Sequence, residues 1–281
     1  MAVASRLVKP ASQELLRLTV QRTERLSPHW MRVTLGGGDI GRFQPMGYDQ
    51  WFRIFLPVHG EAGLERVPAK ANKMLGYLKF LRIPEGMRPA MRSYTVRAYR
   101  PAEGADGAEI DVDFVVHAAA DGSMGPAPSW ALGAQPGEDV AIIDEGLVFN
   151  PERGTGPVVL VADETGLPAV AGICGSLPAD AGGLAIVEVP SADDALDFPR
   201  PDGVALRWVV RTDPQARPGA GALDALRSAS LPGSPFHAFL VGEQQLPTGG
   251  RRHLVGEHGV DKGLIDFCGY WRVGAGAGSV A

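Results

Sequence analysis

The chain has 281 residues, of which 45% are hydrophobic, and its 27 Lys and Arg against 32 Asp and Glu give a formal net charge of −5. A chain of this length exceeds what one ordinary core fills, so we expect two domains with enough apolar residues for two cores. The acidic balance argues against a nucleic-acid partner, because nucleic-acid-binding domains are normally basic.

No apolar run approaches the ~20 residues of a membrane span, and residues 1–10 lack the continuous hydrophobic stretch of a secretion signal. We therefore expect a soluble, cytoplasmic protein with no stable membrane insertion. The two cysteines, Cys174 and Cys268, are too few and too isolated for a disulfide framework or a Cys-x-x-Cys metal site. Both are expected to be small, buried core residues.

The first half of the chain has the pattern of antiparallel β structure. Apolar and polar residues alternate over 16–20, 30–35, 51–56 and 110–116. Short strands divided by Gly, Pro and Asp clusters predict a closed β-barrel. Residues 57–89 lack this alternation and are expected to form a long loop with about one helical turn, and loops of that length are often functional.

A basic stretch runs from Arg66 to Arg100, where nine Lys and Arg residues accompany a single acid, Glu85. Because the rest of the chain is acidic, this stretch predicts a local positive field suited to a small anionic ligand. A solvated surface is the alternative, and it fits the lysines better than it fits Arg92.

Within this stretch the tetrad Arg92-Ser93-Tyr94-Thr95 is followed by His117 and by the loop Gly125-Pro126-Ala127. A basic side chain, an aromatic ring and a hydroxyl on one extended segment can meet the diphosphate, ring face and ribityl edge of a flavin. A Gly-Pro turn that opens a helix offers free backbone N–H groups to phosphates. The arrangement predicts a flavin cradle.

Several of these side chains have structural alternatives. Tyr94 could be a strand aromatic that packs in the barrel, and His117 could hydrogen-bond a loop carbonyl at the end of its strand. Trp130 could cover a core beneath the helix, and Trp271 could close the last strand. We assign no catalytic role to His117.

From residue 156 the pattern changes to continuous apolar runs over 158–162, 184–189, 206–210 and 236–241, with a helix expected over 165–177. Runs buried on both faces and separated by crossovers indicate a parallel sheet with helices on either side. Gly and Pro residues crowd together at 150–156. The predicted domains are therefore 12–150 and 156–275.

Other chemistries find little support. The chain has no Gly-x-x-x-x-Gly-Lys-Ser/Thr loop, no Gly-x-Ser-x-Gly elbow and no His-Glu-x-x-His pair, so the hydrolase and metal-enzyme interpretations are dropped. After the run that ends at Ala162, Gly166, Gly172 and Gly175 lack the Gly-x-Gly-x-x-Gly spacing. We expect no tightly held dinucleotide there, whereas transient docking of a nicotinamide donor on Thr165 and Gly166 remains open.

The order of the motifs over about two hundred residues resembles that of the siderophore-interacting proteins, which are ferredoxin-NADP reductase-like flavoenzymes. The motifs that carry this resemblance are Asp49-Gln50, residues 55–57, 92–97, 113–117, 125–127, 130–131, 136–138, 162–169, 188–190, 241–243, 251–254 and 269–272. The resemblance implies an N-terminal antiparallel β-barrel that binds FAD, followed by a smaller, NAD(P)H-binding-like α/β domain with a parallel sheet. It implies an FAD site made of Arg92, Ser93, Tyr94, Thr95, His117, Gly125, Pro126, Ala127, Trp130, Thr165 and Trp271.

The chain departs from the family pattern in three places. Residues 118–124 make the connection to Gly125 longer than the compact family turn, which leaves the exact phosphate contacts in 118–127 open. Arg53 stands where many relatives have Lys, so a planar fork replaces a point charge. Pro247, Gly249 and Gly250 lie where relatives often have a plain helix, and we expect that helix to begin only near Arg251.

The activity that the resemblance implies is electron relay from NAD(P)H or a reduced ferredoxin, through FAD, to Fe(III) held in a siderophore. Iron is then released because hard oxygen donors hold Fe(II) less well than Fe(III). No acid, base, nucleophile or resident metal is needed. Arg53, Arg252 and Lys262 are expected to bind the anionic substrate in an open, basic cleft beside the flavin. The alternatives are a flavin reductase with another acceptor and a flavin-less siderophore carrier.

Overall fold

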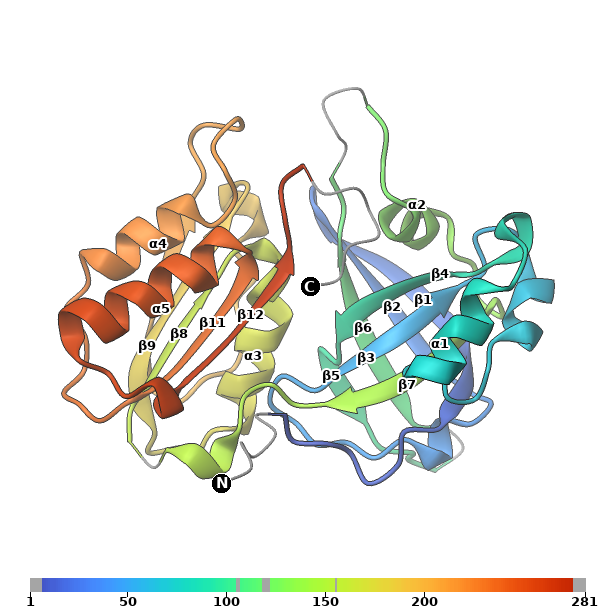
Figure 1. The fold of residues 1–281 in the computed structure, drawn as a ribbon, viewed down its shortest axis with the longest axis horizontal. Helices are drawn as coiled ribbons and strands as arrows, with labels where there is room; N and C mark the ends of the chain where they lie inside the picture. The colour runs from blue at the N-terminus through green and yellow to red at the C-terminus, as the bar shows by residue number, and fades with distance from the viewer. Residues whose placement is uncertain (1–6, 105–106, 118–121, 155, 275–281) are drawn as a thin grey trace. The chain divides into compact units, whose positions relative to one another are not determined.

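The computed structural model describes residues 7–104, 107–117, 122–154 and 156–274 (Figure 1). The chain folds as two compact units. The barrel unit comprises Lys9–Met46 and Gln50–Leu147, and the α/β unit comprises the chain from Val148 onward together with Gly47–Asp49 and Leu7–Val8. The domain limits 12–150 and 156–275 stay a prediction from the sequence.

The barrel unit is built on one antiparallel sheet of seven strands, as the alternation predicted. Its strand order is β4-β3-β7-β1-β2-β6-β5. The strands are β1 (Leu15–Ser27), β2 (Trp30–Gly36), β3 (Trp51–Leu56), β4 (Ala90–Thr95), β5 (Ala98–Arg100), β6 (Glu109–Val115) and β7 (Asp139–Gly146).

The sheet closes on itself because one continuous segment forms both of its edges. Along β4 this segment pairs with β3, and along β5 it pairs with β6. At the bend between them, the N–H of Val96 donates to the carbonyl of Gln50 and the N–H of Arg97 donates to the carbonyl of Asp111. The barrel therefore has no free edge at this point.

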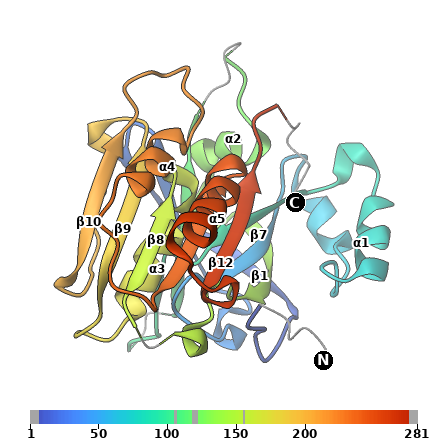
Figure 2. The ribbon, with the colours of Figure 1, turned by 60° about the vertical axis from the view of Figure 1, so that its left-hand side comes forward.

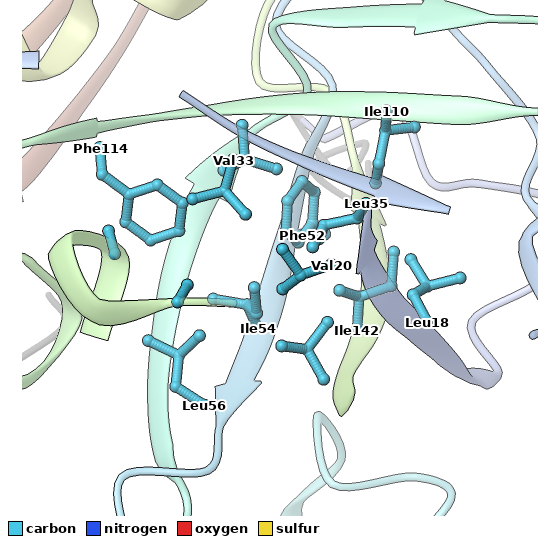
Figure 3. Close-up of a cluster of buried hydrophobic side chains, with 14 of the residues drawn as sticks. Leu18, Val20, Val33, Leu35, Phe52, Ile54, Leu56, Ile110, Phe114 and Ile142 are labelled. Atoms are coloured by element: carbon cyan, nitrogen blue, oxygen red, sulfur yellow. The ribbon is translucent and has the colours of Figure 1, made fainter. Parts of the chain in front are cut away.

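The barrel core consists of the inward-facing side chains of these strands (Figure 3). On β3, Phe52, Ile54 and Leu56 point inward, as the period of two requires. Phe55 points to the outer face of the same strand and is also fully buried. Something must therefore cover the outside of β3.

The segment 57–89 provides that cover, and the prediction of a loop with one helical turn was wrong. It contains the 3₁₀ turns η2 (Glu61–Arg66) and η3 (Glu85–Met87) and a two-turn helix, α1 (Met74–Leu81), which lies over β3 and β7 (Figure 1). The rings of Phe80 and Phe55 meet edge to face with centroids 5.4 Å apart. The segment folds because it has a small core of its own, which a period-of-two search cannot detect.

The other elements of the barrel unit are η1 (Ile40–Arg42) and helix α2 (Pro126–Gly133). The α2 helix starts directly after Gly125, as the Gly-Pro turn predicted.

The α/β unit contains a five-stranded sheet with order β10-β9-β8-β11-β12, in which all pairs are parallel, as predicted. Figures 1 and 2 show α4 and α5 together on one face of this sheet and α3 on the other. Its elements are η4 (Pro151–Arg153), β8 (Val158–Ala162), η5 (Glu164–Gly166), α3 (Leu167–Ser176), β9 (Gly182–Val189), η6 (Ala192–Asp194), β10 (Gly203–Val210), α4 (Ala220–Arg227), β11 (His237–Glu243), α5 (Gln245–His258), η7 (Lys262–Leu264) and β12 (Ile265–Trp271).

Helix α5 corrects the expected helix start near Arg251, because it begins six residues earlier. Pro247 is tolerated because it lies in the first turn, where its missing N–H has no intrahelical partner to lose. A Cβ on Gly249 would lie 2.7 Å from a methyl carbon of Leu223 on α4, and Gly250 is buried. The two glycines let α5 approach its neighbours closely instead of interrupting it.

The cysteines differ from each other. Cys174 is buried in α3, and burial raises the pKa of its thiol to about 12. Cys268 on the edge strand β12 is only partly buried, so the expectation of full burial was wrong for it. None of the described helices is long and apolar enough to span a bilayer. Over the same residues there is no group of three or more His, Cys, Asp or Glu arranged to hold a metal ion.

Candidate functional site

The predicted tetrad lies on β4, where Ser93 pairs with Arg53 and Tyr94 pairs with Phe52 of β3. The alternation of the strand places Arg92 and Tyr94 on one face and Ser93 on the other. The ring of Tyr94 packs against Phe114, with centroids 4.2 Å apart, and stays half-buried. The core contact foreseen as an alternative for Tyr94 is thus present on one side of the ring.

Arg92 is the informative member of this tetrad. Its guanidinium is partly buried, and burial lowers its pKa. Its Nη1 donates to the carbonyl of Met91 at 2.8 Å. Within the described part of the chain, no carboxylate pairs with it. A partly desolvated guanidinium with free donors and no counter-charge is a ready receptor for an anion.

The neighbouring arginines differ from Arg92 in this respect. Arg97 lies 3.6 Å from the carboxylate of Asp113, and Arg100 lies 2.6 Å from that of Asp111. Hydrogen bonds from Arg100 and Thr34 hold the pKa of Asp111 below its usual range, although burial alone would raise it. The positive field predicted for the whole basic stretch is therefore neutralised at its C-terminal end, whereas Arg92 has no carboxylate partner within the described residues.

Helix α2 offers few backbone donors to a phosphate. Gly125 is the residue before the helix and has no capping side chain, and the first turn contains two prolines, Pro126 and Pro128. Because proline has no N–H, Gly125 and Ala127 are the residues of this turn that can donate. His117 is exposed at the end of β6, and the expected contacts within 118–121 lie outside the described residues.

Trp130 is the predicted site residue with the clearest structural role. Its indole Nε1 donates to Glu138 at 2.7 Å, and its ring lies 5.6 Å from that of Phe114 in the barrel core. These contacts fix α2 against the barrel, as the structural alternative proposed. Direct contact of Trp130 with a cofactor stays a prediction.

In the α/β unit, the sheet order places β8 next to β11 where the chain reverses its direction of winding. In open α/β sheets, ligands bind outside the carboxyl ends of the strands at this point. Asp163 lies at this point, directly after β8. Its carboxylate accepts the N–H of Glu243 at 2.6 Å. It also accepts the N–H and the hydroxyl of Thr165, at 2.9 and 2.5 Å. The indole N–H of Trp271 donates to the same carboxylate at 3.3 Å.

The two predicted residues Thr165 and Trp271 are therefore brought together by Asp163, which the sequence analysis included in a motif but did not assign to the site. The signal that could have found it is an acid that directly follows a continuous apolar strand. Burial, followed by the charge of Glu164, raises the pKa of Asp163 to about 7.

Other carboxylates take up the remaining polar groups at this edge of the sheet. Glu188 is the second-last residue of β9. Its carboxylate accepts the N–H groups of Gly219 and Ala222 at the start of α4, both at 3.0 Å. Arg211 bridges Glu164 and Glu188 at 2.6 and 2.8 Å. Four N–H groups near the expected dinucleotide position are thus already bonded to the chain's own acids, which agrees with the missing glycine fingerprint.

The three predicted substrate-binding cations differ in their surroundings. Arg53 in the barrel unit forms an ion pair with the buried Glu145, with 2.9 Å between Nε and Oε1. In the α/β unit, Arg252 on α5 and Lys262 in η7 are exposed. Neither has an ion-pair partner among the described residues. Arg252 and Lys262 are therefore the ones with charge available to a ligand.

Comparison with known proteins identifies the family of this chain. Residues 19–148 match the siderophore-interacting FAD-binding domain, and residues 156–274 match the siderophore-interacting protein domain. A protein of Mycobacterium tuberculosis is 33% identical over 94% of this chain and 92% of its own length. The chain belongs to the siderophore-interacting protein family.

Two further relatives have names that state an activity. The ferric vibriobactin reductase ViuB of Vibrio cholerae is 29% identical over 90% of this chain and 88% of its own length. The NADPH-dependent ferric-chelate reductase of Escherichia coli is 27% identical over 90% of this chain and 91% of its own.

Solved structures confirm the fold. A siderophore utilization protein from T. fusca superimposes with a TM-score of 0.76 and 28% identity, covering 98% of this chain and 97% of that one. A ferredoxin NADP+ reductase from Neisseria gonorrhoeae, at 14% identity, has a TM-score of 0.56 and covers 92% of this chain and 100% of its own. The predicted ferredoxin-NADP reductase-like architecture is therefore confirmed.

Proposed function

We propose that this protein is an FAD-dependent reductase of ferric siderophores that acts in the cytoplasm. The observation that carries the proposal is Arg92, a partly buried guanidinium without a carboxylate partner in the described chain, on the strand where a flavin diphosphate is expected. Family membership and the names of the Vibrio cholerae and Escherichia coli relatives support the same activity.

The residues present fit an FAD, because a cation without a carboxylate partner in the described chain, a half-buried aromatic ring and a helix start without a side-chain cap lie in one unit. Arg92 would bind the diphosphate, Tyr94 would orient the ring system, and Gly125 and Ala127 would donate N–H groups. The full proposed set is Arg92, Ser93, Tyr94, Thr95, His117, Gly125, Pro126, Ala127, Trp130, Thr165 and Trp271. When bound, FAD supplies a carrier that takes electrons in pairs and gives them up singly.

The substrate in this proposal is Fe(III) chelated by a siderophore. Arg252 and Lys262 would attract an anionic chelate, and Arg53 would take part while it remains paired with Glu145. These side chains position the chelate and supply no proton. Reduction lowers the charge on the metal, so hard oxygen donors hold it less tightly and Fe(II) leaves.

The electron donor is proposed to be NAD(P)H or a reduced ferredoxin, docked transiently. The acids at the carboxyl ends of β8 and β9 already accept N–H groups of Thr165, Gly219 and Glu243, which supports brief docking over tight binding. No stable complex with NAD(P)H is expected.

The test is anaerobic reduction of the purified protein with NADH, NADPH or reduced ferredoxin, followed by a ferric-chelate chase with an Fe(II) trap. We expect a flavin absorption band that bleaches with one donor and returns as trapped Fe(II) accumulates. A colourless protein that still binds ferric chelates would replace the proposal with a siderophore carrier. Turnover with other acceptors but not with ferric chelates would replace it with a general flavin reductase.

A further inference from the structure

Helix α1 exposes its apolar side chains in an unusual way. Met74 and Leu75 are 78% and 75% exposed, and Tyr77, Leu78 and Leu81 are also exposed. Among the described residues of the whole molecule, four other large hydrophobic side chains are exposed, and no two of those four belong to the same element. A concentration of this kind on one short helix marks a binding surface.

The orientation of α1 is fixed by its buried side, so the exposure is not accidental. Phe80 packs into the small core over β3 and β7, against Phe55. A Cβ on Gly76 would come within 1.9 Å of the carbonyl oxygen of Lys70, so the helix backbone lies directly against the preceding turn on this side. At 100° per residue, Phe80 and Gly76 lie on one face. Met74, Leu78 and Leu81 then form a stripe on the opposite face, with Leu75 and Tyr77 on its two flanks.

The segment that carries the stripe is rich in positive charge. Residues 66–88 contain six basic side chains and one acid, Glu85, in a chain whose net charge is −5. The basic residues are Arg66, Lys70, Lys73, Lys79, Arg82 and Arg88. The described part of the chain contains no ion-pair partner for any of them, whereas Arg97 and Arg100 are paired. Helix α1 with these six cations is called the α1 surface below.

We propose that the α1 surface docks the protein on anionic lipid bilayers. Apolar side chains on one face of a helix, with lysines and arginines at its borders, are the composition that lies in a membrane interface with its axis in the plane. The basic residues would attract the lipid headgroups, and Lys and Arg stems can reach to the headgroup level beside buried Leu and Met. Tyr77 suits the boundary because its ring is apolar and its hydroxyl is polar.

The charge also argues against the other candidates for an occupant. In a symmetric dimer the same patch meets itself, so two sets of six cations would face each other at the contact. A protein partner needs about 800 Å² of each surface, and a helix of eight residues is only about 12 Å long. A bilayer needs no matched counter-surface, so a lipid bilayer is the occupant that the α1 surface fits best.

The proposal is tested by co-sedimentation of the full chain with vesicles, read without flavin reduction or chelate turnover. We expect binding to vesicles that contain phosphatidylglycerol, little binding to pure phosphatidylcholine, and release at about 0.5 M salt. Exchange of two exposed apolar residues in L75E/L78E should lower partition more than tenfold. Lys70→Gln and Lys79→Gln should each lower it roughly fivefold.

The control is Val210→Glu, which places one glutamate on an exposed apolar residue of the α/β unit. It should bind vesicles as the parent does. All substituted side chains are exposed, so far-UV circular dichroism and the Tm should be unchanged.

Three results would overturn the proposal. The first is an absence of binding to anionic vesicles by the parent. The second is equal binding to neutral vesicles, or unchanged binding by L75E/L78E. The third is a concentration-dependent dimer, in the absence of lipid, that L75E/L78E converts to monomer, because the stripe would then be a contact between two copies. Failure of the proposed reductase activity would leave all of these measurements unaffected.

Discussion

The carboxylate of Asp163 accepts the backbone N–H of Glu243 at 2.6 Å and thereby links the carboxyl ends of β8 and β11. This is the place in the sheet where a dinucleotide would be expected. Its buried donors are instead bonded within the chain.

The first prediction is that Asp163→Ala strongly destabilises the α/β unit. The change leaves the N–H groups of Glu243 and Thr165 without their acceptor, at about 1 to 3 kcal/mol for each unsatisfied buried group. Thr165→Val removes only the hydroxyl contact and should cost about 1 kcal/mol. Urea unfolding measures both. Equal losses in the two variants would show that Asp163 does not hold these strand ends together.

The second prediction concerns the flavin. Arg92→Ala should lose most of its cofactor, because a charge-assisted contact with the diphosphate contributes about 1.5 to 3 kcal/mol. Flavin absorbance per protein and chromatography of the heat-released cofactor measure this, and the parent should release FAD. Arg88→Ala is the control, since its Nε donates to the carbonyl of Ile83 and it is not part of the proposed site. Full flavin occupancy in Arg92→Ala would show that Arg92 does not bind the cofactor and is a solvated side chain.

The third prediction is a fall in stability between about pH 4 and pH 7. Burial raises the pKa of Asp49 to about 7, although the N–H groups of Val148 and Phe149 oppose the shift. A folded-state pKa above the unfolded value stabilises the protein at low pH, and this stability is lost as the pH rises through about 7. Relative to the ordinary aspartate pKa of 3.8, the contribution is at most about 4 kcal/mol.

The urea midpoint measured across this range gives the slope. Asp49→Asn should flatten it, whatever its effect on absolute stability. Asp163 and Asp144, whose pKa values burial raises to about 7 and about 6, should keep part of the slope in that variant. A parent whose stability rises with pH over this range would contradict the prediction.

The fourth prediction addresses substrate binding. Arg252→Ala with Lys262→Ala should weaken binding of an anionic ferric chelate at low salt and leave flavin content intact. The difference from the parent should shrink as salt rises, because exposed charges are screened over about 10 Å at 0.1 M. Arg227→Ala, an exposed arginine already paired with Asp224, is the control for loss of a surface arginine outside the proposed site. Titration of flavin fluorescence with the chelate gives the Kd, and an unchanged Kd at low salt would remove both residues from the site.

The fifth prediction tests the placement of α1. Gly76→Ala gains about 1 kcal/mol of helix propensity, but its Cβ would lie 1.9 Å from a backbone oxygen. Overpacking against rigid backbone costs typically 1 to 3 kcal/mol, so we expect a net loss of stability. Gly86→Ala, with nothing within 4 Å of its Cβ, should change the Tm little. A gain of stability in Gly76→Ala would mean that the helix lies further from the Lys70 turn.

The sequence pattern by itself was enough for eight of the twelve described strands and for an antiparallel β half followed by a parallel α/β half; β4, β5, β7 and β12 were not among the patterned runs. A period of two, as in Phe52 and Ile54 of β3, requires one buried face, and a continuous apolar run such as 158–162 requires two. Both signals are local, so neighbouring residues carry them. The order of the tetrad, His117 and the Gly-Pro turn is likewise readable along the chain.

The tertiary structure decided which charges and which apolar faces are free. Arg92, Arg97 and Arg100 belong to one basic stretch in the sequence. The pairing of β5 with β6 brings Asp111 to Arg100, whereas no carboxylate of the described residues pairs with Arg92. The residues of α1 are as apolar as those of a buried helix, and the packing of Phe80 turns Met74 to solvent. The physical reason is the same in both cases: ion pairing and burial depend on residues distant in the chain, which no local pattern specifies.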